Sequence, residues 1–256
     1  MPAVSATIIA HNEAANIARA IRSLACADEV IVVDSGSTDE TAATARLLGA
    51  QVITHPFEGF AAQKIFATMQ ARHDWILSLD ADEELDATAQ QAVEQWKRSA
   101  PHASGYRFAR RARYLGRWIH HSGWYPDSKL RLFDRRCGRW QGAYVHESVV
   151  VEGAVEKLPG EILHYTCDSF AEHRARVEFY TDLAAREMFE RRTGPGPLAR
   201  VFAPAWVCFS SYFLRLGILD GYQGLLIAWM AGHTVRRKYA KWAKLVRGEA
   251  AAGRGE

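Results

Sequence analysis

The sequence contains little cysteine. Its four cysteines, Cys26, Cys137, Cys167 and Cys208, lie at least 30 residues apart among 256 residues, and no pair forms a C-x-x-C motif. This spacing argues against a zinc site built from paired cysteines and provides no disulfide framework. It favours free thiols in a reducing cytosol.

Long apolar runs are also missing. The longest stretches without a fixed charge are Val201–Leu214, which Pro204 interrupts, and Gly221–Val235. Both are shorter than the roughly 18–20 apolar residues of a membrane-spanning helix. The amino-terminal residues have no basic start and reach an acid at Glu13, so they predict a first strand and not a signal peptide. We therefore expect no transmembrane segment.

Two common nucleotide-binding motifs are absent as well. No G-x-G-x-x-G follows the first apolar run, and the sequence contains no P-loop. These absences argue against a dinucleotide oxidoreductase and a P-loop nucleotidase. With 48% apolar and 24% charged residues, the chain can still bury a core, as one large α/β domain or as a domain with an appendage.

The net charge of +3 hides an uneven distribution. Residues 1–97 carry 6 Lys/Arg and 14 Asp/Glu, residues 98–140 carry 11 and 2, and residues 141–256 carry 15 and 13. An acidic module that continues into a basic strip predicts two ligands of opposite charge, bound at two places.

Short β-type runs recur about every 22–25 residues, at Ser5–Ala10, Glu29–Asp34, Gln51–Thr54 and Trp75–Asp80. Helix-like segments separate them, which is typical of an α/β protein with a parallel sheet. We expect the first helix to begin near Asn12. The second has Ser37 or Thr38 as its amino-terminal cap, and Gly49 ends it.

Polar clusters follow three of these strands, at residues 11–13, 34–39 and 80–83. Open parallel sheets bind ligands at the carboxyl ends of their strands. We therefore expect these three clusters to form one site.

Several segments resemble one known family. IIAHNEAANI (8–17), VIVVDSGSTDET (30–41), QKIFA (63–67) and WILSLDADEEL (75–85) are similar to the nucleotide-sugar domain of the inverting family 2 glycosyltransferases, which have the GT-A fold. Residues 105–135, VHE (145–147) and ILHYT (162–166) resemble the bacterial lipopolysaccharide-core glucosyltransferases within that family. The resemblance covers about residues 4–190.

This resemblance implies a UDP-sugar donor at the strand ends. It assigns the uracil base to Asp34, with Ala10, His11 and Glu13 around the same pocket, and the diphosphate to Lys64. Ala10 and His11 depart from the residues usual in the family. His11 is then either a side chain that stacks on the base or a solvated turn histidine.

Asp80-Ala81-Asp82 is a D-x-D motif. A hard divalent cation held by carboxylates neutralises the charge that develops on a leaving diphosphate. The resemblance implies Mg²⁺ or Mn²⁺ bound mainly by Asp82, with Asp80 near the ribose or sugar. It also implies a histidine that completes the metal shell, for which His164 is the first candidate and His146 the second; a structural role for either stays open.

An inverting transfer needs a base that takes the proton of the acceptor hydroxyl. The resemblance points to Glu147, with Asp127 as the alternative; a structural salt bridge is the other interpretation of Glu147. A desolvating aromatic surround would make the carboxylate more basic. Four aromatic residues can supply this surround and a stacking platform for the sugar: Trp124, Tyr125, Trp140 and Tyr144.

Arginines alternate with aromatic residues over 105–139. We expect Arg110, Arg113, Trp124 and Arg131 to bind the acceptor. Arginine forks match phosphates and carboxylates, so an anionic glycolipid such as lipid A-core fits them. Single-stranded nucleic acid is a weaker candidate, and a solvated charged face is the remaining alternative.

A long amphipathic helix is predicted over about Ser169–Arg192, with a core face of Phe170, His173, Val177, Tyr180 and Ala184. The segment Gly194–Pro197 then predicts a hinge. Residues 201–230 beyond it are apolar and aromatic, and residues 236–247 are basic. Such helices bind anionic lipid surfaces. The alternative is a helical hairpin that packs on the protein or on a second subunit.

These features predict a GT-A domain over residues 1–193 and a helical region over 194–256. The domain would comprise a nucleotide-sugar half (1–97), an acceptor half (98–168) and a helix (169–193). The expected protein is a metal-dependent inverting glycosyltransferase, peripheral on the cytoplasmic face of the bacterial inner membrane, that moves a hexose from UDP-glucose to an inner-core heptose. The alternatives are an enzyme of the same fold that acts on a peptide or another polysaccharide, and a catalytically silent sugar-nucleotide-binding assembly protein. A homo-oligomer is left open.

Overall fold

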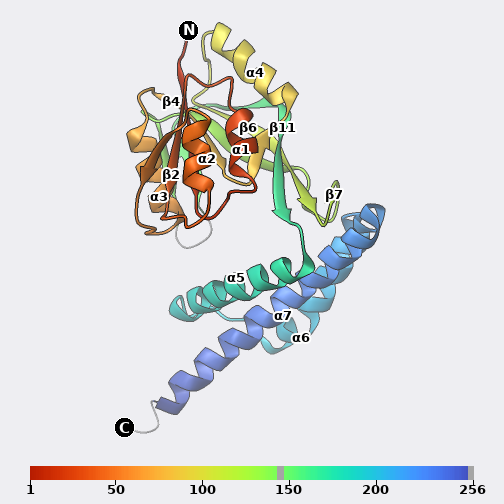
Figure 1. The fold of residues 1–256 in the computed structure, drawn as a ribbon. Coiled ribbons are helices and arrows are strands. Elements are labelled where there is room, and N and C mark those ends of the chain that lie inside the picture. The colour runs from red at the N-terminus through yellow and green to blue at the C-terminus, as the bar shows by residue number, and fades with distance from the viewer. Residues whose placement is uncertain (143–146, 253–256) are drawn as a thin grey trace. The chain divides into compact units, whose positions relative to one another are not determined.

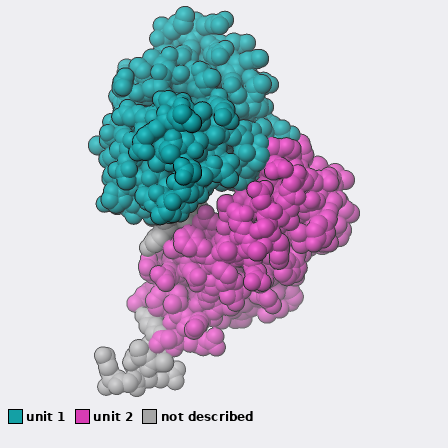
Figure 2. Space-filling view, in the orientation of Figure 1, with its two compact units in different colours: residues 1–112, 126–165 teal, residues 113–125, 166–256 magenta. Residues whose placement is uncertain are grey.

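The computed structural model of the protein describes residues 1–142 and 147–252. The chain forms two compact units, the first from residues 1–112 and 126–165 and the second from residues 113–125 and 166–256 (Figure 2). The sequence predicts a division at residue 194 instead. The long helix that precedes this position belongs with the carboxyl-terminal helices, and so does the short segment 113–125.

Strands and helices alternate through the first half of the chain (Figure 1). Their order is β1 (Val4–Ala10), α1 (Ile17–Arg22), β2 (Glu29–Asp34), α2 (Thr41–Leu47), β3 (Gln51–Thr54), α3 (Phe60–Gln70), β4 (Trp75–Asp80), β5 (Glu83–Leu85) and α4 (Ala87–Arg98). The remaining strands are β6 (Gly105–Tyr114), β7 (Arg117–Trp118), β8 (Asp127–Asp134), β9 (Gly138–Gln141), β10 (Ser148–Val151) and β11 (Val155–Cys167). The α/β class predicted from the spacing is confirmed.

The main sheet has the strand order β3-β2-β1-β4-β8-β6-β11-β5, and β7 pairs with β6. The first four strands are parallel, and β8 joins β4 in the antiparallel direction. Strands β9 and β10 form a separate antiparallel hairpin. The parallel half carries the predicted donor site, because its strands all end at one edge.

Two buried clusters cover the two faces of the parallel strands. On one face, Ile8, Val32 and Leu77 pack with residues of α1 and α4. On the other face, Ile31 and Val33 pack with residues of α3 and of the β9–β10 hairpin. Successive side chains of a strand point to opposite faces, so the run VIVV in β2 supplies both clusters.

Two helix starts differ from the prediction. Helix α1 begins at Ile17 and not near Asn12, because Asn12 has a left-handed backbone with φ of 56°. The N-cap of α2 is Glu40, which makes no side-chain cap hydrogen bond. The predicted cap Ser37 uses its hydroxyl on Asp34 instead. Gly49, with φ of 84°, follows α2 as predicted.

The second unit contains α5 (Phe170–Glu190), α6 (Pro197–Phe209), the π-helical turn η1 (Ser210–Leu214), the 3-10 turn η2 (Gly217–Asp220) and α7 (Gly221–Ala252). Ser169 caps α5 by accepting a hydrogen bond from the Glu172 amide. The predicted hinge links α5 to α6, with Pro197 as the first residue of α6.

The buried stripe of α5 differs from the prediction. Val177 is buried as expected, but Thr181 and Ala185 complete the stripe, whereas Tyr180 is exposed. Glu178 also faces α7, where its carboxylate accepts hydrogen bonds from Arg237 at 2.7 and 2.8 Å. The apolar pattern alone missed this polar contact.

No single helix in the described residues is long and apolar enough to cross a membrane. The pair Pro197–Leu214 and Gly217–Gly248, bent by 72° at its break, passes the test of length and composition when taken together.

Candidate active site

The carboxyl ends of the central strands bring three predicted positions to one edge of the sheet. Ala10 is the register partner of Asp34 between β1 and β2, and Ile9 is the partner of Asp80 between β1 and β4. The sequence prediction that these strand ends converge is confirmed.

Asp34 shapes the loop after β2. It is buried, and its carboxylate accepts hydrogen bonds from the amides of Gly36 and Ser37 at 3.2 and 3.0 Å. Carboxylates have about four acceptor positions, so a further donor such as a base N–H can be accommodated. His11 lies exposed beside this loop, where its Nε2 is 3.3 Å from the Asn12 amide nitrogen. The main-chain amide of Glu13 donates to the Thr41 hydroxyl.

Lys64 connects two acids from distant parts of the chain. Its Nζ lies 2.8 Å from Asp80 Oδ1 and 3.0 Å from Glu147 Oε1. Only 3% of the side chain is exposed, and the ammonium lies 5.0 Å from the centre of the Trp140 ring. A lysine this buried needs compensating charge, which both carboxylates supply. Lys64 is therefore a buried lysine that joins two acids of the candidate site.

A chain of buried ion pairs continues from Asp80. Arg131 donates through one Nη2 to Asp80 Oδ2 and to both oxygens of Glu83, all at 2.8 Å. Arg110 then bridges Glu83 at 2.8 Å and Asp127 at 2.6 Å. The five side chains alternate in sign, so each charge has a neighbour of opposite sign.

These pairs set the protonation of the acids. Burial alone would raise the pKa of Asp80, but Lys64 and Arg131 outweigh it and hold that pKa well below its usual range. The same competition between burial and Arg131 lowers the pKa of Glu83. For Asp127, burial is outweighed by Arg110, and its pKa is also lowered. A carboxylate held in its ionised form is a weak base, which argues against Asp127 as the proton acceptor.

Two of the arginines predicted for the acceptor have internal partners. Arg131 is buried, and Arg110 uses its guanidinium on Glu83 and Asp127. The sequence could not show this, because the partners of Arg131 lie about 50 residues away along the chain. We assign both arginines to the organisation of the D-x-D segment.

Asp82 and Asp80 contact different residues. The Oδ2 atom of Asp82 lies 3.2 Å from His164 Nε2, because β11 pairs with β5 and brings His164 opposite Glu83. Neighbouring ligands of an octahedral ion with bonds of about 2.1 Å lie about 3.0 Å apart, so this pair fits two positions on one cation.

Asp80 is a less suitable metal ligand, because its two carboxylate oxygens already pair with the side chains of Lys64 and Arg131. No group of three or more His, Cys, Asp or Glu side chains in the described part of the chain is arranged to hold a metal ion. Mg²⁺ typically takes one or two protein carboxylates together with substrate phosphates and water. Asp82 and His164 are compatible with such a site, completed by a diphosphate.

Two buried polar residues were missed by the sequence prediction. Gln63 donates to the Ser35 hydroxyl at 2.8 Å, and its Oε1 lies 2.9 Å from His55 Nδ1, so it ties α3 to the loop after β2. Glu83, described above, is the second. Both stood inside the quoted motifs, QKIFA and LDADEEL. The sequence signal that could have identified both residues is a polar side chain within a segment that is expected to be buried.

Three of the predicted residues belong to the second unit. Arg113 and Trp124 lie there, where Arg113 is 3.7 Å from Asp168 and Trp124 packs edge-on against Tyr114. Tyr125 is in that unit as well. The predictions for Tyr144 and His146 fall outside the described residues.

A family model decides the identity of the chain. The model described as "Glycosyl transferase family 2" matches residues 5–158, which include every site residue of the first unit except His164. The chain belongs to glycosyl transferase family 2.

Two relatives that match most of this chain agree with this assignment. An uncharacterized glycosyltransferase of Rickettsia bellii is 32% identical over 246 residues, 87% of this chain and 80% of the relative. The lipopolysaccharide core biosynthesis glycosyltransferase LpsC of Rhizobium meliloti is 29% identical over 265 residues, 94% of each chain. Among solved structures, glucosyl-3-phosphoglycerate synthase from Mycobacterium tuberculosis, in complex with Mn²⁺, UDP and glucosyl-3-phosphoglycerate, is 21% identical with a TM-score of 0.40, covering 53% of this chain and 57% of that one.

The glycosyltransferase has the GT-A fold that the resemblance predicted, with a carboxyl-terminal helical part. Its D-x-D motif begins at the last residue of β4 and ends just before β5; Asp80 contacts Lys64 and Asp82 contacts His164. The two acids of the motif thus have different partners.

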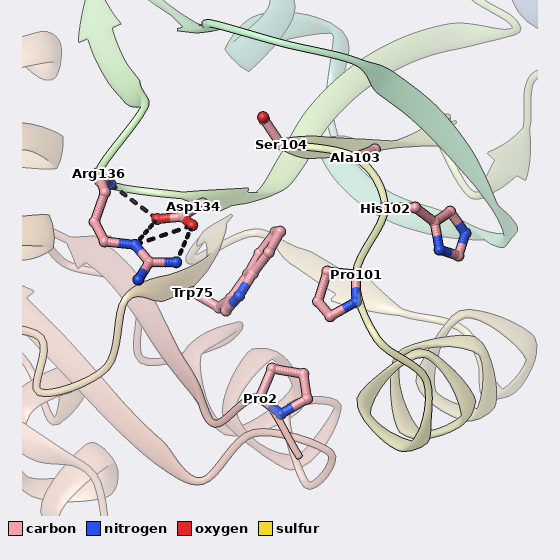
Figure 3. Close-up of a pocket in the computed structure, with 8 residues that line it drawn as sticks. All are labelled: Pro2, Trp75, Pro101, His102, Ala103, Ser104, Asp134 and Arg136. Atoms are coloured by element: carbon pink, nitrogen blue, oxygen red, sulfur yellow. Dashed lines mark hydrogen bonds and ion pairs between the residues drawn. The ribbon is translucent and has the colours of Figure 1, made fainter.

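The glycosyltransferase also has a pocket of about 450 Å³ at the other edge of the sheet (Figure 3). Its lining is formed by Pro2, Trp75, Pro101, His102, Ala103, Ser104, Asp134 and Arg136. Trp75 begins β4 whereas Asp80 ends it, so about 17 Å of strand separates this pocket from the D-x-D motif. The pocket is not part of the candidate active site.

Proposed function

We propose that this glycosyltransferase is a metal-dependent inverting hexosyltransferase. It transfers glucose from UDP-glucose to an inner-core heptose of a lipopolysaccharide precursor. The similarity to LpsC over 94% of both chains supports an acceptor of the lipopolysaccharide core. The donor is proposed from the residues at the strand ends.

The observation that carries the proposal is the position of Lys64 between Asp80 and Glu147. A diphosphate leaving group needs a cation beside it, and an acceptor hydroxyl needs a base close to the same reacting carbon. Lys64 and Glu147 lie within hydrogen-bond distance of each other, so one small region holds both functions.

Donor binding would use residues from three strand ends. Asp34 accepts the base N–H, with Ala10, His11 and Glu13 around it, and Lys64 turns from its carboxylates to the diphosphate. Asp82 and His164 hold Mg²⁺ or Mn²⁺, which supplies positive charge to the leaving oxygens when bound. Asp80, fixed by Arg131, lies beside the ribose or sugar.

In the transfer step, the acceptor hydroxyl oxygen forms a bond to the anomeric carbon from the face opposite the diphosphate. The bond from that carbon to the diphosphate oxygen breaks, and UDP leaves with the electron pair. Glu147 takes the hydroxyl proton. Attack from the opposite face inverts the configuration.

The acceptor would be an anionic glycolipid of the lipid A-core type, reached at the cytoplasmic face of the inner membrane. Arg113 and Trp124 remain candidates for its recognition. An acceptor with phosphate or carboxylate groups predicts that transfer weakens as the salt concentration rises.

The decisive experiment is a panel of nucleotide sugars with purified core acceptors, followed by linkage analysis of the product. Asp82→Ala should abolish transfer, and chelator should do the same to the unchanged protein, with Mg²⁺ or Mn²⁺ restoring it. Retention of activity in Asp82→Ala after chelation would overturn the metal-dependent mechanism. UDP release without acceptor separates the enzyme from a silent binder, which would release none.

A further inference from the structure

The outer side of α6 carries a continuous apolar stripe. Its exposed members recur at steps of three or four residues, except that two of them are adjacent, and the last lies on η1. They are Leu198, Val201, Phe202, Trp206, Phe209 and Phe213, which we call the α6 stripe. Phe202 is 63% exposed and Trp206 60%. This spacing places the side chains on one side of a helix.

The apolar surface continues beyond the stripe. Exposed Leu214, Leu216, Ile218, Leu219 and Tyr222 follow on η1, η2 and the start of α7. Single exposed apolar residues are ordinary on a soluble protein, but a concentration of large ones on one helix and the turns that follow it marks a candidate site of interaction.

The inner side of α6 is already occupied by α7. Gly232 of α7 approaches α6 so closely that a Cβ there would lie 2.7 Å from the Pro204 carbonyl oxygen and 3.2 Å from Cys208 Cβ. The α6 stripe is therefore the free side of a helix whose other side is packed. It needs a partner from outside the unit.

The charge around the stripe selects the partner. Residues 191–248 carry ten Lys/Arg and a single acid, Asp220. Asp220 is buried and bound to His121 at 3.1 Å, so the exposed charges of this segment are all basic. A second copy of the same surface would bring like charges together, whereas an anionic surface would be attracted.

The dimensions favour a helix that lies in the membrane plane. Helix α6 and η1 together contain 18 residues, about 27 Å of helix, which is shorter than the roughly 30 Å hydrocarbon core. A one-sided apolar stripe with aromatic residues is typical of interfacial helices, which bury that side at the boundary of headgroups and acyl chains.

We infer that the α6 stripe inserts into one leaflet of an anionic phospholipid membrane and holds the enzyme there without spanning it. This inference deepens the proposed function, because it names the surface that would bring the enzyme to a lipid-linked acceptor. The inference depends on the proposed function in one respect, because that function identifies which membrane the enzyme would bind.

The test is flotation of the full chain with vesicles of phosphatidylethanolamine and phosphatidylglycerol, compared with phosphatidylcholine alone. The double variant Phe202→Gln/Trp206→Gln should bind the anionic vesicles at least about ten-fold more weakly, since two large apolar side chains are lost. The matched control is Leu47→Gln/Met69→Gln, which changes two exposed apolar residues of the first unit and should bind like the unchanged protein.

Three results would overturn the inference. The first is that the double variant binds anionic vesicles as strongly as the unchanged protein. The second is that the unchanged protein does not bind these vesicles. The third is that the unchanged protein and the control are dimers in solution, whereas the double variant is a monomer. The last result would assign the stripe to a second copy of the chain.

Two further measurements keep the test independent of folding and catalysis. Quenching of the unchanged protein by lipids brominated near the headgroup should diminish in Trp206→Phe, and equal quenching would contradict insertion. UDP release from the donor without acceptor should be the same in the double variant and the control. Failure of UDP release in every protein would count against the proposed function alone.

Discussion

Lys64 shows how a single buried cation organises the candidate site. Without a donor, its ammonium is shared by Asp80 and Glu147. A diphosphate carries more negative charge than either carboxylate and would compete for Nζ. Donor binding would then release Glu147 to accept a proton, so the same contact that neutralises Lys64 would keep the base occupied until the donor arrives.

Glu147→Gln should lower kcat for transfer by about 10²–10⁴-fold, because the amide cannot take a proton. The KM for UDP-glucose should not rise, because the neutral amide competes less strongly than the carboxylate with the diphosphate for Lys64. Steady-state transfer assays check both quantities. Glu152→Gln, an exposed acid that follows β10, is the matched control. A kcat within about two-fold of the unchanged protein would exclude Glu147 as the base.

Glu83→Gln should destabilise the protein by about 3–5 kcal/mol, the usual cost of breaking a buried ion pair by removing one charge. Glu83 accepts from both Arg131 and Arg110, and the variant leaves Arg131 with Asp80 as its remaining acidic partner. Chemical denaturation measures the change in the free energy of unfolding. If Glu83→Gln costs no more than a surface substitution, about 0.5 kcal/mol, the ion-pair chain does not stabilise the fold.

At the scale of elements, the strands of the parallel sheet were predictable because their signals are local. The bounds of β2, β3 and β4 agree with the sequence prediction, since each is a short apolar run between polar segments. The start of α1 was not predictable, because it depends on the left-handed backbone of Asn12.

The residues of the candidate site were easier to predict from the sequence than the ion pairs between them. Asp34, Asp80 and Lys64 converge as expected from strand ends and motifs. The partners of Arg131 were not predictable, because β8 joins the sheet beside β4 only in the folded chain. A count of charges along the sequence cannot show which of them neutralise one another.

The contribution of the contact between α5 and α7 to stability should depend on pH. Hydrogen bonds from Arg237 and Lys241 lower the pKa of Glu178 to about 2. A carboxyl group whose pKa is lowered in the folded state stabilises the protein at pH values above the ordinary pKa of glutamate. This stabilisation is lost as the pH falls towards 2.

Glu178→Gln should therefore reduce stability at pH 7, by no more than about 1 kcal/mol because Glu178 is 38% exposed and solvent screens the pair. The difference between the two proteins should shrink between about pH 4.5 and pH 2. Denaturation curves at several pH values measure it. A difference that stays constant over this range would show that the carboxylate charge is not responsible.

At the scale of the whole molecule, the uneven charge has an internal explanation. The acidic module and the basic strip were expected to bind two different ligands. In the structure, Arg110 and Arg131 of the strip neutralise Glu83 and Asp80 of the module. Some of the opposite charges therefore neutralise one another within the fold. Only the remaining charges are available to a metal, a donor or an acceptor.

The division of the chain leads to the last prediction. Tyr114 and Ile119 are buried in a cluster with Ile227 of α7, and the carboxylate of Asp220 accepts hydrogen bonds from the amides of two residues that follow Ile119. A chain that ends at residue 193, the boundary predicted from the sequence, loses these partners and exposes the apolar cluster. It should aggregate or melt without cooperativity, as measured by gel filtration and calorimetry, whereas a chain that ends at residue 248 should behave like the full chain. A monomeric, cooperatively melting 1–193 chain would show that the first unit and α5 fold without α6 and α7, and that segment 113–125 does not need them.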